Sequence, residues 1–290
     1  RGNLLPMMEI NSWLTGRRGV ALPFTDDCEP LCHNESSFQK LFEAAADFGV
    51  QHGWKHLELR GGRQFLAGAT PSLSFFGHRL DLTAGESELF SRFDSATRRA
   101  IRKAEKEGVT VEITHRFDSL LSFYELQCLT RRRHGLPPQP FAFFRNLHQH
   151  VLSRNAGFIA LAHYQKKPVA GAVFFFHGPR AVFKFGASDE SFQHLRGNNL
   201  AMWEAIKTLA RHGLRQLDFG KTAEAHDGLR RFKLGWGATE HRIEYFKFNL
   251  NRRAFVADRD QAFGWHNRIF QSLPLPASRL IGSVLYRHWA

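Results

Sequence analysis

Apolar residues recur at helical spacing in several stretches of the chain. Residues 37–53 carry Phe38, Leu41, Phe42 and Ala45 three or four positions apart, which predicts a helix that ends near one of the glycines at its far end. Further stretches with this spacing are predicted helices: 94–108, 118–135, 141–152 and 198–213. Short apolar runs bounded by turn residues predict strands in the first part of the chain, at 3–14, 17–24, 55–62 and 71–82.

The pattern changes after residue 156. Strand-like runs follow one another, joined by short turns at 166–168 and 178–180, and this predicts an antiparallel meander. After the helix at 198–213 come a strand, a short helix and a strand, at 214–219, 228–234 and 243–248. The order β-β-β-α-β-α-β predicts an α/β (α+β) fold, in which the polar stretch 218–238 connects two core elements.

Length and composition indicate a globular protein. The chain has 290 residues, of which 43% are apolar, so it can form one large domain or two smaller ones. It contains no apolar run of the length that spans a membrane. It begins with Arg, so we expect a fragment of a longer chain.

The cysteines bear on the compartment and on metal binding. Only 3 are present, too few for a disulfide framework, which indicates a reducing, cytoplasmic compartment. Cys28, Cys32 and His33 lie close together, but their spacing is not that of the usual zinc sites. Small buried hydrophobic residues are the favoured interpretation, and no metal is expected.

The formal net charge of +13 predicts an anionic partner, such as phosphate, nucleic acid or an acidic lipid surface. The predicted helix at 94–108 concentrates this charge, with Asp94 or Ser95 as its cap. Its cations are Arg98, Arg99, Arg102, Lys103 and Lys106. Two interpretations stay open: a solvated helix face, or a basic surface for an anionic substrate, to which Arg98, Arg102 and Lys103 would contribute.

Five motifs in order resemble one family: "RRAIRKAEKEGVTVE", "KKPVAGAVFFF", "KFGASDE", "GLRQLDFGKT" and "GLRRFKLGWGA". Together they resemble the FemABX-like branch of the acetyltransferase (GNAT) superfamily, over about residues 90–250. The resemblance implies two tandem GNAT-like domains with mixed, mainly antiparallel sheets flanked by helices, the first truncated at its N-terminus. We expect these at 1–110 and 111–250, followed by a C-terminal helical segment at 251–290.

One loop departs from the pattern of coenzyme-A-dependent relatives, in which R/Q-x-x-G-x-G/A holds a pyrophosphate on backbone N–H groups. The corresponding stretch here is "HLRGNN", with His194 in place of Arg or Gln and Asn199 in place of Gly or Ala. This departure argues against an intact coenzyme A site.

Candidate site residues lie in the stretch 218–238. The resemblance places a functional Lys at Lys233, which we expect to polarise the reacting carbonyl or stabilise the oxyanion; a solvated helix lysine is the alternative. Asp218 is expected to orient the attacking ammonium or accept its proton, or else to cap the following loop. His226 is a candidate proton shuttle. The predicted substrate-binding residues are Arg230 and Arg231, as phosphate ligands, with Gly220 and Gly228.

The predicted function is transfer of an acyl or aminoacyl group to an amine of a cell-envelope or exopolysaccharide precursor. No cofactor is expected beyond the co-substrate, which is aminoacyl-tRNA or acyl-CoA. The partner is then a phosphate-bearing or anionic substrate, nucleotide- or lipid-linked, with peripheral membrane contact as an option. The alternatives are a CoA-thioester-dependent N-acyltransferase and a non-catalytic module that binds an anionic polymer or membrane surface. The tail at 279–290 is a predicted helix that docks on the protein or lies on a membrane, with docking favoured.

Overall fold

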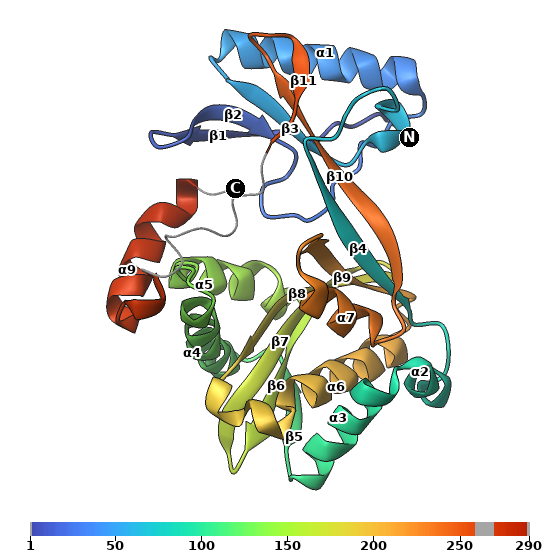
Figure 1. Ribbon diagram of the computed structural model, residues 1–290, viewed down its shortest axis with the longest axis vertical. Coiled ribbons are helices and arrows are strands. Elements are labelled where there is room, and N and C mark those ends of the chain that lie inside the picture. The colour runs from blue at the N-terminus through green and yellow to red at the C-terminus, as the bar shows by residue number, and fades with distance from the viewer. Residues whose placement is uncertain (1, 259–269, 289–290) are drawn as a thin grey trace.

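The computed structural model describes residues 2–258 and 270–288, and these contain a single sheet of 11 strands (Figure 1). The strands are β1 Met8–Ser12, β2 Gly16–Val20, β3 His56–Arg60, β4 Leu73–Asp81, β5 Thr110–Thr114, β6 Gly157–Tyr164, β7 Lys167–His177, β8 Arg180–Ser188, β9 Gln216–Ala223, β10 Thr239–Asn249 and β11 Ala254–Val256. Their order is β1-β2-β3-β10-β4-β9-β8-β7-β6-β5, with β11 beside β10.

The sheet is mixed and mainly antiparallel, as predicted. Only the β2–β3 and β8–β9 pairs are parallel. The long strands β4 and β10 run from one part of the molecule into the other (Figure 1). β10 pairs with β3 at one end and with β4 along the rest, so a strand from late in the chain completes the sheet of the early part.

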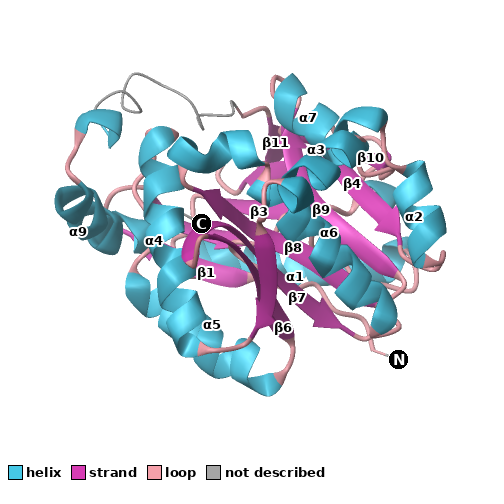
Figure 2. Ribbon diagram, turned by 90° about the horizontal axis from the view of Figure 1, so that it is seen from below, coloured by secondary structure: helices cyan, strands magenta, loops and turns pink. Residues whose placement is uncertain are grey.

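Helices cover both faces of the sheet. They are α1 Glu35–Gln51, α2 Glu86–Arg92, α3 Ser95–Lys106, α4 Phe117–Arg133, α5 Phe141–His150, α6 Gly197–Arg211, α7 Asp227–Leu234 and α9 Leu275–Leu285. Around strands β6 to β8, α4 and α5 lie on one face and α3 and α6 on the other (Figure 2). α1 packs against β3 and β10 through Phe38 and Phe42.

Side-chain packing divides the molecule differently from a boundary at residue 110. Leu89 of α2 and Ile101 of α3 are buried in one core with β6, β7, β9 and α6. The helices that precede residue 110 therefore pack with the later part of the chain. The domain limits 1–110 and 111–250 stay a prediction. Side-chain packing crosses the boundary between them, and so does the pairing of the late strand β10 with β3 and β4.

Several predicted element ends shift in the structure. α4 begins at Phe117, one residue before the predicted start. α6 begins at Gly197, also one residue before the predicted start, and follows Arg196. β9 continues to Ala223, so the first third of the polar stretch 218–238 is strand and not loop. Asp94 does cap α3, because its carboxylate accepts a hydrogen bond from the N–H of Thr97.

The C-terminal segment is not wholly helical. It begins with β11, and its residues 259–269 lie outside the described part. α9 starts at Leu275, earlier than predicted, and docks on α4. Gly282 lets the helix approach closely, since a Cβ there would come within 2.0 Å of the carbonyl oxygen of Pro138. Tyr286, just beyond the helix, stacks on Phe24 with ring centroids 4.9 Å apart. None of the described helices combines the length and apolar character needed to cross a membrane.

Candidate active site

The parallel strands β8 and β9 pair over only three residues each. Arg180, Ala181 and Val182 pair with Gln216, Leu217 and Asp218, and beyond this point the two strands separate. A cavity of about 260 Å³ lies beside the part of β8 that has no partner in β9, and its lining includes Phe183 of β8 and Leu229 of α7. The separation interrupts an otherwise continuous sheet.

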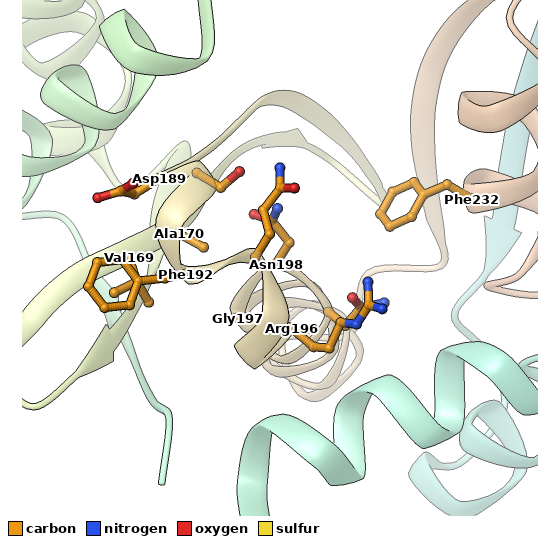
Figure 3. A pocket seen from close by; sticks show the side chains of 11 residues that line it. Val169, Ala170, Asp189, Phe192, Arg196, Gly197, Asn198 and Phe232 are labelled. Atoms are coloured by element: carbon orange, nitrogen blue, oxygen red, sulfur yellow. The ribbon is translucent and has the colours of Figure 1, made fainter. Parts of the chain in front are cut away.

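The N-terminus of α6 borders a second cavity of about 250 Å³ (Figure 3). Asn198 and Phe232 line it, as does Arg196, which has a left-handed backbone with φ of +61°. His194, which occupies the position of a coenzyme A ligand in the family pattern, is exposed and not part of this lining. This cavity nevertheless has a cation in its lining, because Arg196, two residues later in the chain, borders it.

A basic groove of about 610 Å³ continues from this cavity between α3 and α7. Its cations are Arg99, Lys103, Arg196 and Arg231, and none of them forms an ion pair with any residue that the structure describes. Gly228 also lines it. The positive charge lies next to the N-terminal end of α6, whose dipole favours anions. The groove therefore suits a ligand that carries phosphate groups.

Two cations of the predicted basic surface lie elsewhere. Arg98 and Arg102 do not line the groove, and the guanidinium of Arg102 lies 5.5 Å from the ring centroid of Phe90 on α2. Residues four positions apart share a helix face, so Arg99 and Lys103 point to the groove while Arg98 and Arg102 share another face. The prediction of a substrate surface on α3 is thus corrected to the Arg99 and Lys103 side.

Arg230 is engaged inside the protein. Its Nε and Nη2 donate to the two carboxylate oxygens of Glu240 at 2.7 and 2.8 Å. Its guanidinium also lies 4.1 Å from the ring centroid of Phe76. This bidentate pair connects α7 to β10, so the phosphate-binding role predicted for Arg230 is corrected to a structural one. Its neighbour Arg231 lines the basic groove, and phosphate binding by Arg231 stays a prediction.

A third cavity, of about 400 Å³, lies on the opposite face of the sheet. Three carboxylates line it together with the cations Arg79, Arg180 and Lys184, and we call it the acidic cavity after its clustered carboxylates. It is lined by Asp26 and Asp27 from the loop after β2 and by Asp218 and Gly220 of β9. Leu217 and Phe219 point from the same strand into the core around α6. Since strand residues alternate between faces, the acidic cavity and the basic groove flank β9 from opposite sides.

Arg79 of β4 connects the carboxylates of the acidic cavity. Its guanidinium lies 3.4 Å from Oδ2 of Asp218 and 3.5 Å from Oδ2 of Asp27. Burial raises the pKa of Asp27 to about 6, with Glu29 and Asp218 adding to the rise and Arg79 opposing it. Asp27 can therefore exchange a proton near neutral pH, as a general base must.

Lys233 is buried, with 3% of its surface exposed. Its Nζ donates to the backbone carbonyl oxygens of Gly220 and Lys221 at 2.8 and 2.9 Å. Burial lowers its pKa to about 8, while the nearby Asp26 and Asp218 oppose the shift. Two of its three N–H donors are thus used by β9, and the expectation that Lys233 polarises a substrate carbonyl stays a prediction. The geometry is that of a residue that positions the strand.

His226 directly precedes α7 and lines none of the cavities described above. It lies near His134. Burial is the main cause that lowers the pKa of His134, and neighbouring cations and His226 lower this pKa to a smaller extent. The structure therefore brings Asp218 and Gly220 into one cavity, and Lys103, Arg231 and Gly228 into another. His226 joins neither group.

Four functional candidates were missed by reasoning from the sequence: Asp26, Asp27, Arg79 and Arg196. The adjacent acids in "FTDDCEP" were a usable signal, because two carboxylates in a loop after a strand are a common site feature. Nothing local links them to Asp218, which lies far away in the sequence.

The acetyltransferase (GNAT) domain family matches residues 91–242, and the chain belongs to this family. It is similar to the lipid II:glycine glycyltransferase of Staphylococcus haemolyticus, with 21% identity over 238 residues. The match covers 58% of this chain and 57% of the relative, so the chain spans little more than half of the relative's length.

Solved structures show the same fold. FemX is 16% identical, with a TM-score of 0.68 over 85% of this chain and 84% of FemX. A tandem GNAT protein from the clavulanic acid biosynthesis pathway is 11% identical, with a TM-score of 0.50 over 78% of this chain and 76% of that protein. These likenesses confirm the predicted fold class. Together with the family match and the glycyltransferase relative, they support the resemblance to the FemABX-like branch.

Gly220→Ala tests the backbone geometry beside the acidic cavity. Gly220 has φ of +71°, and a Cβ there would come within 2.4 Å of Oδ2 of Asp26. We expect a loss of about 1–3 kcal/mol in the free energy of unfolding, measured by urea denaturation. Gly228→Ala is the control, because nothing lies within 4 Å of its Cβ, and it should leave stability unchanged or slightly raised. Equal effects of the two changes would contradict the role given to Gly220.

Lys233→Met tests the buried ammonium. The folded-state pKa of Lys233 of about 8 lies below the ordinary lysine pKa of 10.5, so the unfolded chain binds more protons between these pH values. The contribution of Lys233 to stability should therefore rise with pH across this window, by on the order of 2–3 kcal/mol. Unfolding free energies of wild type and Lys233→Met, measured from pH 7 to about 10, should diverge accordingly. Parallel curves, such as those expected for the exposed control Lys106→Met, would contradict the assignment.

Proposed function

We propose that the chain transfers an acyl or aminoacyl group from a phosphate-bearing donor to an amine, forming an amide. One observation carries this proposal: in a GNAT fold, the acidic cavity lies where β8 and β9 begin to separate, and a basic groove lies on the other face of the sheet, between α3, α6 and α7. A donor rich in phosphate fits the basic side, and an ammonium fits the acidic side. The two reactants would meet where the sheet is open.

The acidic cavity supplies the groups that the acceptor amine needs. Asp27 and Asp218 can bind its ammonium, and Asp27 can then accept one proton to free the nitrogen lone pair. The amine nitrogen attacks the activated carbonyl carbon, and a C–N bond forms. The bond to the donor's ester oxygen or thioester sulfur then breaks, and the second proton lost by the nitrogen passes to the departing oxygen or sulfur. Arg180 and Lys184 line the same cavity and supply positive charge for the oxyanion or for an anionic group of the acceptor.

The acceptor proposed is a lipid-linked peptidoglycan precursor, and the donor an aminoacyl-tRNA. Support for the acceptor comes from the relative named lipid II:glycine glycyltransferase. The four cations of the basic groove support a polyanionic donor. A cytoplasmic location belongs to this proposal and is supported by the cysteines, since Cys28, Cys32 and Cys128 are free thiols.

A second candidate donor is an acyl-CoA. It is favoured by the cavity at the N-terminus of α6, where Gly197 begins the helix and Arg196 adds a cation. A pyrophosphate could bind there to backbone N–H groups. His194 and Asn199 still depart from the family pattern for this loop, and the transfer assay below includes both donors.

Asp27→Asn tests the acceptor side. The 290-residue chain is incubated with aminoacyl-tRNA or acyl-CoA and with lipid II, and the mass increase of the precursor is measured. With pKa about 6, Asp27 should make the wild-type rate rise with pH up to that value and then level off. Asp27→Asn should lose this rise and about 10²–10⁴-fold in kcat. The control Asp47→Asn, on the exposed side of α1, should match wild type. No transfer from either donor, or an unchanged pH profile in Asp27→Asn, would contradict the proposal.

Charge reversal in the basic groove tests the donor side. Arg99→Glu with Arg231→Glu should weaken binding of an RNA minihelix and flatten its dependence on salt by about one unit of log–log slope per lost phosphate contact. Arg98→Glu with Arg102→Glu is the matched control. These two residues lie on α3, as Arg99 does, but outside the groove. Equal losses from both pairs would show a general charge effect and no specific groove.

A further inference from the structure

The turn between β1 and β2 presents two large apolar side chains to solvent. Trp13 is 76% exposed and Leu14 is 52% exposed. The hairpin that carries them projects from the side of the molecule on which α9 also lies (Figure 1). A tryptophan at the apex of a projecting hairpin contributes little to the core, so its position calls for a partner outside the fold.

The turn is held in place by hydrogen bonds of its own. Oγ of Ser12 accepts from the N–H groups of Leu14 and Thr15 at 3.2 and 3.0 Å. Gly16 completes the turn with φ of +82°, and Nζ of Lys55 lies near its backbone. Trp13 and Leu14 are therefore fixed on an ordered turn, which lowers the entropy cost of using them for binding.

Positive charge surrounds these two apolar side chains. Arg17 and Lys55 are exposed, and neither forms an ion pair with the residues that the structure describes. Glu9 is the one acid in the hairpin, and its carboxylate accepts a hydrogen bond from the indole N–H of Trp54. The tip thus combines an apolar apex with an uncompensated basic flank.

The C-terminal segment extends this surface. The rings of Trp13 and His288 lie 5.4 Å apart in an edge arrangement. Arg18 donates to the carbonyl oxygen of His288, which connects the hairpin to the turn that follows α9. On α9 itself, Leu280 and Val284 are exposed by 67% and 49%.

We propose that the hairpin tip, defined by Trp13, Leu14, Arg17 and Lys55, docks on an anionic lipid surface. Trp side chains favour the boundary between lipid headgroups and acyl chains, and Arg and Lys beside them attract anionic lipids. A second copy of the chain is a weaker fit, because a stable dimer buries about 800 Å² per partner and a convex tip with two apolar side chains offers far less. The inference rests on the proposed function in one respect only: a lipid-linked acceptor would lie in the membrane on which the tip docks.

The position of the tip relates it to the acidic cavity. β2 leads from the tip straight into the loop that carries Asp26 and Asp27. Two contacts hold Phe24 of this loop. Its ring stacks on Tyr286, which follows α9, and its carbonyl oxygen accepts a hydrogen bond from Nζ of Lys184. Docking of the tip would therefore fix the orientation of this loop toward the membrane.

Vesicle flotation tests the proposal with the 290-residue chain. Wild type should float with vesicles of phosphatidylcholine and phosphatidylglycerol, and much less with pure phosphatidylcholine. Trp13→Ser with Leu14→Ser should weaken binding about tenfold or more, since it removes the apolar contact. Arg17→Glu with Lys55→Glu should weaken binding to the anionic vesicles and reduce its dependence on salt. Val50→Ser on α1, where Val50 is 56% exposed, is the matched control and should bind as wild type does.

The outcomes separate the partners. Wild type that stays unbound to anionic vesicles, or a Trp13→Ser, Leu14→Ser variant that floats like wild type, overturns the proposal. A dimer in sedimentation equilibrium that this variant dissociates shows that a second copy covers the tip, and also overturns it. Thermal melting of all variants excludes unfolding as the cause. Vesicle binding without amide transfer counts against the proposed function alone, and transfer to a water-soluble acceptor should be unaffected by the tip variants.

Discussion

The two hydrogen bonds from Lys233 to the carbonyls of Gly220 and Lys221 are the interaction on which the site depends. β9 leaves regular pairing with β4 here, because the register shifts between Gly77 and Arg79. The left-handed conformation of Gly220 turns the backbone at this irregularity. Buried carbonyls need hydrogen-bond partners, and β8 has already separated from β9 at this point. The Lys233 ammonium takes the place of the missing strand.

This arrangement sets the electrostatics on both sides of β9. The carboxylates of Asp26 and Asp218 lie near enough to Lys233 to oppose the lowering of its pKa by burial. The same carboxylates belong to the acidic cavity, in which Asp27 has a raised pKa. Removing Lys233 would therefore change the fold of β9 and the charge balance of the cavity together. A strong effect on activity would follow from these two changes alone.

Strand exchange explains why the acidic cavity exists. β10, from late in the chain, lies between β3 and β4 and so fixes the early part of the chain against the later part. The hydroxyl of Tyr245 in β10 donates to the carbonyl oxygen of Asp26 at 2.8 Å. The backbone N–H of Lys221 also lies 3.4 Å from Oδ2 of Asp26. The loop after β2 is thereby held over β9, and residues from both ends of the chain form one cavity.

Local patterns in the sequence determined the order of the elements, because burial of one face makes apolar residues recur at the period of each helix or strand. The sequence motifs determined the family resemblance and, with it, the expectation of a mixed sheet. They also pointed to Asp218, Gly220, Lys103 and Arg231, which line the acidic cavity or the basic groove and whose roles stay predictions. The partners of these residues depend on tertiary structure, since only strand pairing brings Asp26 and Asp27 to Asp218.

The intramolecular partners of two predicted site residues also depend on the tertiary structure. Arg230 and Lys233 carry charges typical of ligand-binding residues, and Glu240 and two carbonyls of β9 accept hydrogen bonds from them. A sequence shows which side chains can carry charge or donate hydrogen bonds. The fold decides whether these side chains bind a protein group or a substrate, because segments distant in the sequence supply the competing partners.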